Sequence, residues 1–298
     1  MNKPIYKLYD WIDENKLDWD NLSLNPNAIQ LLEANPDKIN WYNLSSNPNA
    51  IKLLEANPDK IDWFYLSKNQ NAIELLNKNQ DKIKWYNLSA NVNAIKLIKA
   101  NPDKINWDRL SSNSNAIELL IANPDKINWH YLSLNPNAYE LLKANIDKIN
   151  WYMIHNNENI EIINILKDYP DKINWFYLSV NPNAIKLLKA NPNKINWRLL
   201  SRFSNDLLIF KENYDKIDWC LLNYNINQNA IELLKENPDK INVKLLSANP
   251  SIFTLDYTQM TINFQPFAEE IIAKVMNPDR IKRLSVIYKF EFKDWFDY

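Results

Sequence analysis

Tryptophan recurs along this chain at a nearly constant interval, and that interval constrains the fold more than any other feature of the sequence. Seven Trp residues follow one another in steps of 22, and three more continue the series in steps of 24, 22 and 22: Trp19, Trp41, Trp63, Trp85, Trp107, Trp129, Trp151, Trp175, Trp197 and Trp219. The repeated unit reads W-x-x-L-S-x-N-P-N-A-I-x-L-L-x-x-N-P-D-K-I-N. A fixed period of about 20–50 residues is the signature of a repeat architecture, in which each unit buries its apolar face against its neighbours.

One unit predicts two helices. Asn47 is a good helix N-cap and Pro48 suits the first helical turn, so a helix of about nine residues is expected to begin there. Pro58 ends it, because a residue before proline is pushed out of the α region. Asp62 can then cap a shorter helix that starts at Trp63.

Neither helix is long enough to be stable alone, so each unit has to stack on the next. The sequence therefore predicts an all-α solenoid with no sheet. At about 8–10 Å per packed helix, ten units would form a curved rod on the order of 80–100 Å along its path. We expect residues 19–249 to form ten repeats and a partial eleventh, because Val243 begins another unit that decays after Asn249. Residues 1–18 and 250–298 are expected to form an N-terminal and a C-terminal helical cap over the two ends.

Two units are irregular. Those starting at Trp151 and Trp219 each carry two extra residues, and Glu158 stands where Pro48 stands in its own unit. We expect a longer helix or loop in the Trp151 unit, and a bend in the solenoid at both.

Composition excludes several kinds of site. The chain has no Gly, so the glycine-rich phosphate-binding loops are absent. Lys and Arg number 35 against 36 Asp and Glu, a balance that argues against a dedicated nucleic-acid-binding protein. A single cysteine, Cys220, allows no intrachain disulfide. No run of apolar residues is long enough for a membrane span or a signal peptide, so we expect no membrane partner and a cytoplasmic location.

Residues of one type that recur at the same position of successive repeats form rows, which we call ladders, and these favour structural roles. The Trp residues are expected in the core, and the repeated Asn residues are expected to bond to backbone at turns. A row of Lys could track phosphates, but a neighbouring row of Asp opposes its field, as in Asp59-Lys60 and Asp103-Lys104. His130 and His155, the only histidines, do not have zinc-ligand spacing. We therefore expect no catalytic residue, cofactor or metal.

The two residues after each Trp vary between repeats and are rich in Tyr, Phe, His and Arg. Side chains of these types are enriched in binding hot spots, and solenoids often bind partners through variable positions on one face. Trp and Leu at the first and fourth positions of the short helix point inward, so the second and third cannot both do so. The candidate binding row is Tyr42, Phe64, Tyr65, Tyr86, Arg109, His130, Tyr131, Tyr152 and Tyr177.

Two resemblances extend this interpretation. The N-P-N…L-L…N-P-D alternation over residues 19–249 resembles the leucine-rich-repeat variant proteins, which implies a right-handed solenoid of alternating α- and 3₁₀-helices. Those proteins have a slightly longer unit and no equivalent Trp. The tail is similar to a C-terminal segment of many giant-virus (Mimivirus-like) repeat proteins, through the runs Leu255–Tyr257, Phe267–Lys274 and Asn277–Leu284. That resemblance implies a viral protein made in host cytoplasm, or carried in a virion, and implies no enzymatic activity.

The sequence thus predicts a non-enzymatic repeat scaffold that binds a protein partner through the candidate binding row. The alternative is a nucleic-acid-associated protein that uses the Lys ladder. An enzyme is a third possibility, which a deep pocket gathering His155, Glu158 and neighbouring acids would favour. The partner's identity and the oligomeric state stay open.

Overall fold

The computed structural model describes residues 4–277 and 280–283. The chain forms two compact units, one from residues 1–7 and 254–298 and the other from Leu8 to Phe253. Pro278, Asp279 and Leu284, which belong to the C-terminal motif, lie outside the described residues.

The Leu8–Phe253 unit is an all-α repeat solenoid, as predicted. Each repeat contains a short α-helix, a turn, a second α-helix and a single turn of 3₁₀-helix. The first helices of the repeats are α1 (Trp19–Leu24), α3 (Trp41–Ser46), α5 (Trp63–Leu66), α7 (Trp85–Ser89), α9 (Trp107–Ser111), α11 (Trp129–Leu132), α14 (Trp175–Leu178), α16 (Trp197–Phe203), α18 (Trp219–Leu222) and α20 (Val243–Leu246). The second helices are α2 (Ile29–Glu33), α4 (Ile51–Glu55), α6 (Ile73–Lys78), α8 (Ile95–Lys99), α10 (Ile117–Ile121), α12 (Tyr139–Lys143), α13 (Ile162–Asp168), α15 (Ile185–Lys189), α17 (Leu207–Glu212) and α19 (Gln228–Lys235).

The 3₁₀ turns coincide with the P-D-K motif. They are η2 (Pro36–Lys38), η3 (Pro58–Lys60), η4 (Gln80–Lys82), η6 (Pro102–Lys104), η8 (Pro124–Lys126), η9 (Ile146–Lys148), η11 (Pro170–Lys172), η13 (Pro192–Lys194), η14 (Tyr214–Lys216) and η15 (Pro238–Lys240). In some repeats the turn before the second helix is also 3₁₀: η5 (Val92–Ala94), η7 (Ser114–Ala116) and η12 (Pro182–Ala184). In the Trp151 repeat, η10 (Ile154–Asn156) replaces the short helix.

The cap predicted at Asp62 forms, but the one predicted at Asn47 does not, and the second helix is shorter than expected. The Asp62 carboxylate accepts hydrogen bonds from the backbone N–H groups of Phe64 and Tyr65, and so caps α5. Asn47 accepts from the N–H of Asn49 and therefore holds a turn, and α4 begins only at Ile51 with five residues. The reason is local: an Asn side chain that bonds two residues ahead favours a turn over a helical start.

The core is a continuous layer of small and branched aliphatic side chains. Leu44, Ala50 and Leu54 are fully buried, and the equivalent positions of the other repeats repeat the pattern. The expectation that Trp belongs to this core is only partly correct. Trp41 and Trp63, for example, are half-buried, because an indole at the edge of a short helix is covered on one side only.

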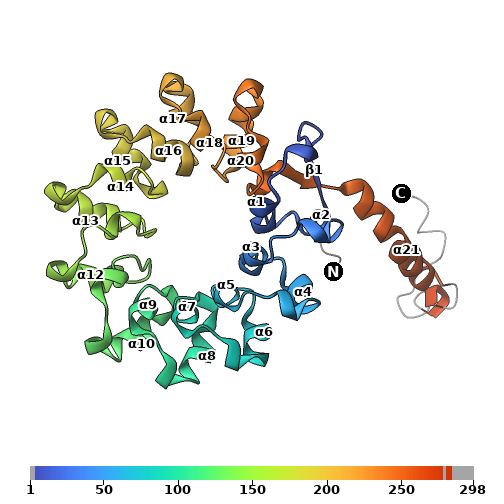
Figure 1. Ribbon diagram of the computed structural model, residues 1–298, viewed down its shortest axis with the longest axis horizontal. Helices are drawn as coiled ribbons and strands as arrows, with labels where there is room; N and C mark the ends of the chain where they lie inside the picture. The colour runs from blue at the N-terminus through green and yellow to red at the C-terminus, as the bar shows by residue number, and fades with distance from the viewer. Residues whose placement is uncertain (1–3, 278–279, 284–298) are drawn as a thin grey trace. The chain divides into compact units, whose positions relative to one another are not determined.

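The Leu8–Phe253 unit closes on itself, whereas a curved rod with a cap at each end was expected. Figure 1 shows α20 beside α1, with the short helices along the inner side of a ring and the second helices along its outer side. Across the seam, the Asn25 Nδ2 donates to the carbonyls of Ser247 (3.0 Å) and Asn249 (2.9 Å). The Ser247 Oγ accepts from the N–H of Asp18 at 2.8 Å. Closure removes the exposed ends that the expected caps were needed to cover.

The seam is a repeat assembled from both ends of the unit. The C-terminal half contains α20 and η16 (Pro250–Ile252), and the N-terminal half contains η1 (Glu14–Lys16) with its buried neighbour Leu17. The expected helix over residues 1–18 is absent from the described residues of this segment. Residues Asp13–Asp18 instead take the place of the N-P-D-K-I-N motif, which the repeat that begins at Val243 lacks. The N–H of Tyr9 joins the halves by donating to the Ile252 carbonyl at 3.1 Å.

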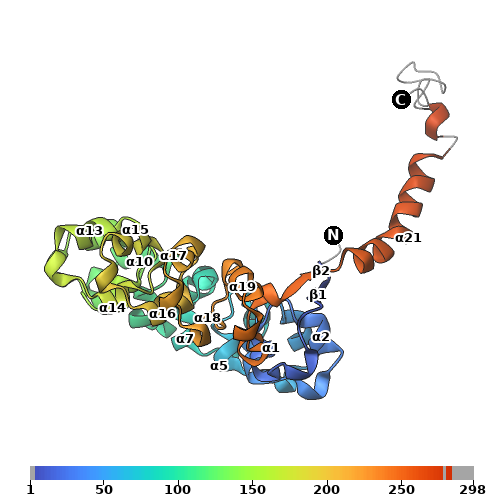
Figure 2. The ribbon, with the colours of Figure 1, turned by 90° about the horizontal axis from the view of Figure 1, so that it is seen from above.

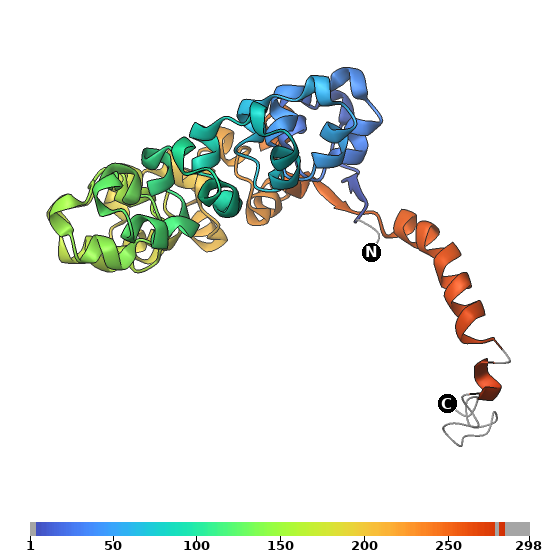
Figure 3. The same cartoon turned by 90° about the horizontal axis from the view of Figure 1, so that it is seen from below.

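A two-stranded sheet was not predicted. It pairs β1 (Tyr6–Leu8) with β2 (Phe253–Leu255), as Figure 2 shows, and the late orange segments again lie beside the early blue ones in Figure 3. Three-residue strands carry too few residues for an alternating pattern to be visible in the sequence.

The irregular repeats absorb their extra residues before or within the second helix. In the Trp151 repeat, Ile160 and Glu161 form a turn before α13, which has seven residues. In the Trp219 repeat the extra residues lengthen α19 to eight. The expected change of rotation between repeats stays a prediction.

The other unit contains α21 (Tyr257–Val275), capped by the Asp256 carboxylate. Its helical character agrees with the expectation for residues 250–298. Its apolar side chains, including Phe264, Phe267 and Ile271, are exposed.

Candidate functional site

Buried Asn side chains form a hydrogen-bonded ladder through the ring. Asn47 Nδ2 donates to the carbonyls of Ser23 and Asn25 in the preceding repeat, at 3.0 and 2.9 Å. The same pair of bonds is made by Asn69, Asn91, Asn113 and Asn135. These residues are fully occupied in joining repeats, so the structural interpretation of the Asn ladder is confirmed.

A second ladder uses the Ser of each L-S motif. Ser45 Oγ donates to the Trp41 carbonyl and accepts from the N–H of Asp62, the residue that caps the short helix of the next repeat, at 2.8 and 3.0 Å. In the Trp151 repeat, His155 takes the place of this serine: its Nε2 accepts from the N–H of Asn174 at 2.8 Å. Burial lowers the pKa of His155, and the backbone carbonyls of Tyr152 and Trp151 act in the opposite direction. The neutral imidazole is therefore a structural acceptor.

The Lys ladder has local partners. Lys38 Nζ lies 4.3 Å from the ring centre of Trp19, and Lys148 lies 4.7 Å from that of Trp129. Lys82, Lys104 and Lys216 cover Trp rings in the same way. Other members pair with the adjacent Asp, as Lys126 does with Asp125 at 3.4 Å. The indole that the core leaves half-exposed is thus covered by the ammonium group at the end of its own repeat.

The candidate binding row divides into two classes by exposure. The residue directly after Trp is exposed: Tyr42, Tyr86 and Tyr152 keep 50%, 50% and 51% of their surface, and Phe64 and His130 are exposed as well. The second residue after Trp is half-buried, and this class contains Tyr65, Arg109, Tyr131 and Tyr177. Phe176 belongs to the exposed class but was left out of the predicted row, although its position after Trp175 indicates it.

The half-buried class packs between repeats. Tyr65 contacts Tyr42 of the preceding repeat, with ring centres 3.9 Å apart and a hydrogen bond between the hydroxyls. Tyr177 contacts Tyr152 in the same way, with ring centres 4.3 Å apart. The hydrogen bond with Tyr42 and, to a smaller extent, burial raise the pKa of Tyr65. These contacts hold the exposed tyrosines in place.

Arg109 forms the central cluster of the row. Its guanidinium carbon lies 5.1 Å from the ring centre of Tyr86 and 5.5 Å from that of Tyr131. His130 packs edge-on against Tyr131, and its Nδ1 lies 2.9 Å from the Asn150 Nδ2. The structure thus brings the predicted residues together as clusters on neighbouring short helices of the ring.

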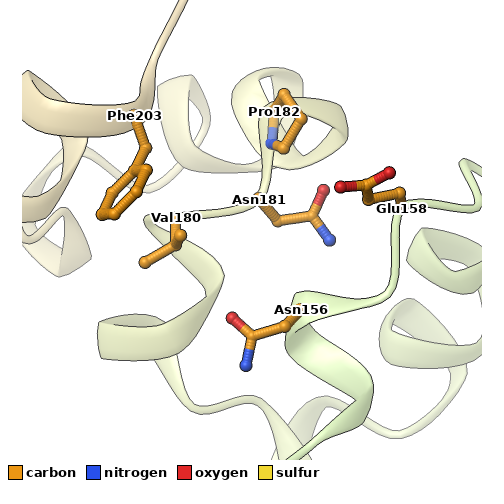
Figure 4. A pocket seen from close by; sticks show the side chains of 6 residues that line it. All are labelled: Asn156, Glu158, Val180, Asn181, Pro182 and Phe203. Carbon is orange, nitrogen blue, oxygen red and sulfur yellow. The ribbon is translucent and has the colours of Figure 1, made fainter. Parts of the chain in front are cut away.

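A pocket of about 290 Å³ opens at the Trp151, Trp175 and Trp197 repeats, shown in Figure 4. It is lined by Asn156, Glu158, Val180, Asn181, Pro182 and Phe203. Glu158 faces it but His155 is not among its lining residues, so the arrangement that would have favoured an enzyme is not formed there. No group of three or more His, Cys, Asp and Glu that could hold a metal occurs among residues 4–277 and 280–283.

In the described part of the chain, no helix is both long and apolar enough to cross a membrane. Comparison of the chain with protein families, curated proteins and solved structures yields no match.

Proposed function

We propose that this protein is a non-enzymatic scaffold that binds a protein partner through the exposed residues of the candidate binding row. The observation that carries the proposal is the exposure of Tyr42, Tyr86 and Tyr152, each about half-exposed: Tyr42 and Tyr86 lie on short helices along the inner side of the ring, and Tyr152 lies in the turn before η10. Aromatic side chains with polar tips are large, rigid contacts of the kind found at the centres of protein interfaces.

The clusters behind these residues favour the same function. Tyr65 and Tyr177 hold Tyr42 and Tyr152 through ring contacts and hydroxyl hydrogen bonds. A side chain that is already held loses less conformational entropy when a partner covers it, so binding is stronger for the same contact area.

The Lys ladder gives less support to nucleic-acid binding, the alternative function. Lys38, Lys82 and Lys104 lie over Trp rings, and their Asp neighbours reduce the positive field. If the ladder nonetheless binds phosphates, oligonucleotide affinity should fall steeply with salt concentration. We expect no measurable oligonucleotide binding near physiological salt.

The resemblance of the tail to giant-virus proteins supports a viral origin and a site of action in host cytoplasm or the virion. It leaves the partner unidentified, so a test has to show at which position of the ring a partner touches the protein.

Cys220 provides the test. It is the single cysteine of the chain, it is exposed, and it directly follows Trp219, at the position that Tyr42 occupies after Trp41. A benzophenone maleimide on Cys220 should cross-link a discrete partner from host-cell extract. The matched control moves the probe to α6 on the outer side of the ring, in the double variant Cys220→Ser/Glu74→Cys.

The proposal predicts cross-linking from position 220, loss of the product in Tyr42→Ala/Tyr86→Ala/Tyr152→Ala, and no product from position 74. Circular dichroism checks that the triple variant is folded. Equal cross-linking from both positions, or an unchanged product in the folded triple variant, would place the binding surface elsewhere.

A further inference from the structure

The Asn ladder is interrupted beside the pocket of Figure 4. In the Trp197 repeat, α16 runs on to Phe203, and Ser204 takes the place that Asn47 holds in its repeat. Ser204 is buried, its Oγ accepts from the N–H of Asp206, and its carbonyl accepts from Asn225 Nδ2, as an Asn of the ladder would. A serine hydroxyl has one donor where an Asn amide has two, and in the described part of the chain Ser204 makes no hydrogen bond to the carbonyls of Ser179 and Asn181 in the preceding repeat.

Where the ladder is interrupted, the carbonyl of Asn181 can accept a further hydrogen bond, and a pocket lies beside it. The Asn181 carbonyl accepts from the N–H of Ala184, and in regular repeats its second lone pair receives the amide of the next Asn. Here no Asn of the Trp197 repeat supplies that amide, and Asn181 lines a pocket whose volume of about 290 Å³ is small for a drug-sized ligand and suited to one side chain.

The lining of the pocket has the chemistry of a cation site. Glu158 stands where Pro48 stands in its own repeat, and its carboxylate takes part in none of the ion pairs of the described chain. Asn156 adds an amide oxygen. Phe203 adds a partly exposed aromatic ring on the opposite side of the pocket (Figure 4), and the guanidinium carbon of Arg202 already lies 5.2 Å from the centre of that ring. A carboxylate, acceptor oxygens and a ring face together favour a flat group that carries several N–H donors and a positive charge.

We propose that this pocket binds a guanidinium group, such as an arginine side chain. Its N–H groups would bond the Glu158 carboxylate and the acceptor oxygens of Asn156 and Asn181, while its plane stacks on Phe203. A guanidinium group fits better than an ammonium group, because its planar fork reaches two acceptors and an aromatic face at once. The proposal concerns a site separate from the candidate binding row and does not depend on it.

Isothermal titration calorimetry with the intact protein tests the proposal. The probes are the peptide Gly-Gly-Arg-Gly-Gly, its lysine and citrulline counterparts, and blocked free arginine. The citrulline peptide keeps the shape of the side chain and removes the charge. We expect the arginine peptide to bind about tenfold or more tightly than the citrulline peptide, and several-fold more tightly than the lysine peptide. Equal affinity of blocked arginine and the peptide indicates a free guanidinium compound as ligand, whereas stronger peptide binding indicates a protein.

Two variants provide the controls. Ser204→Asn restores the residue of the regular ladder, which should fill the site from within, keep or raise the melting temperature and weaken binding about tenfold. Glu158→Gln removes the charge at an exposed position and should weaken binding by a similar factor. The proposal is overturned if the arginine peptide does not bind the wild-type protein at millimolar concentration, if it binds no better than the citrulline peptide, or if folded Ser204→Asn and Glu158→Gln proteins bind it as tightly as the wild type.

Discussion

The side-chain amide of Asn25, in the first repeat, donates a 2.9 Å hydrogen bond to the main-chain carbonyl of Asn249, near the end of the last repeat. It is the same bond that Asn113 makes to Asn91, its immediate neighbour in the series, at 2.9 Å. The two repeats at the ends of the sequence are therefore neighbours in the ring, joined in the same way as repeats in its middle.

This equivalence predicts equal costs for removing the amide at either place. Asn25→Ala and Asn113→Ala should each lower the free energy of unfolding by about 1–3 kcal/mol, because buried carbonyls lose their donors. Urea denaturation of the two variants measures the difference. In an open solenoid Asn25→Ala would lose only the bond that Asn25 accepts from the N–H of Asn27, so a clearly smaller effect at position 25 than at 113 would show that the ring is open.

Truncation separates the seam from the C-terminal helix. Deletion of residues 256–298 keeps every hydrogen bond between Asp18, Asn25 and the last repeat, so the melting temperature should change little. Deletion of 243–298 removes those partners and should lower the free energy of unfolding by at least about 2 kcal/mol, with aggregation. Thermal unfolding and size-exclusion chromatography report both outcomes. If the shorter deletion also causes aggregation, the C-terminal helix does act as a cap.

His155 makes stability depend on pH. Its folded-state pKa is lowered by burial from an ordinary value of 6.5, so below that value the unfolded chain binds a proton that the folded chain resists. The free energy of unfolding should therefore be constant above about pH 7 and fall as the pH drops below 6.5 toward the lowered pKa.

His155→Ser, the residue of the regular repeat, should remove this part of the pH dependence. His130→Ser is the matched control, because His130 is exposed. Denaturation curves between about pH 5 and 8 test the comparison. An unchanged slope in His155→Ser would assign the dependence to other groups.

The Lys–Trp contacts predict a small but measurable contribution. Lys104 lies 5.0 Å from the ring centre of Trp85, so Lys104→Gln should lower the free energy of unfolding by about 0.5–1 kcal/mol. Lys60→Gln serves as the control at an equivalent exposed position, since the described contacts include no ring under Lys60. A double-mutant cycle with Trp85→Leu isolates the pair. A coupling energy near zero would mean that these lysines are simply solvated.

The sequence by itself determined those features that depend on residues close together in the chain. Asp62 as a cap, Pro58 as a helix stop and Leu44 as a core residue follow from local chemistry. That Tyr42 is exposed while Tyr65 is half-buried between repeats was decided by the packing of neighbouring repeats. In the pocket, only the replacement of Pro by Glu158 was noticed in the sequence. The sequence also shows Phe203 where the repeat has Asn, but only the structure shows that α16 continues through Phe203 and that Ser204 takes the place of the Asn.

Tertiary structure decided the closure. Whether a chain of repeats ends as a rod or a ring depends on the sum of small rotations between successive units, and no single unit encodes that sum. The segment Asp13–Asp18 does match the second half of a repeat, and Val243–Asn249 matches the first half. Their meeting nevertheless requires all the intervening repeats to bring Asp18 to Ser247, and Asn25 to Asn249, within hydrogen-bonding distance.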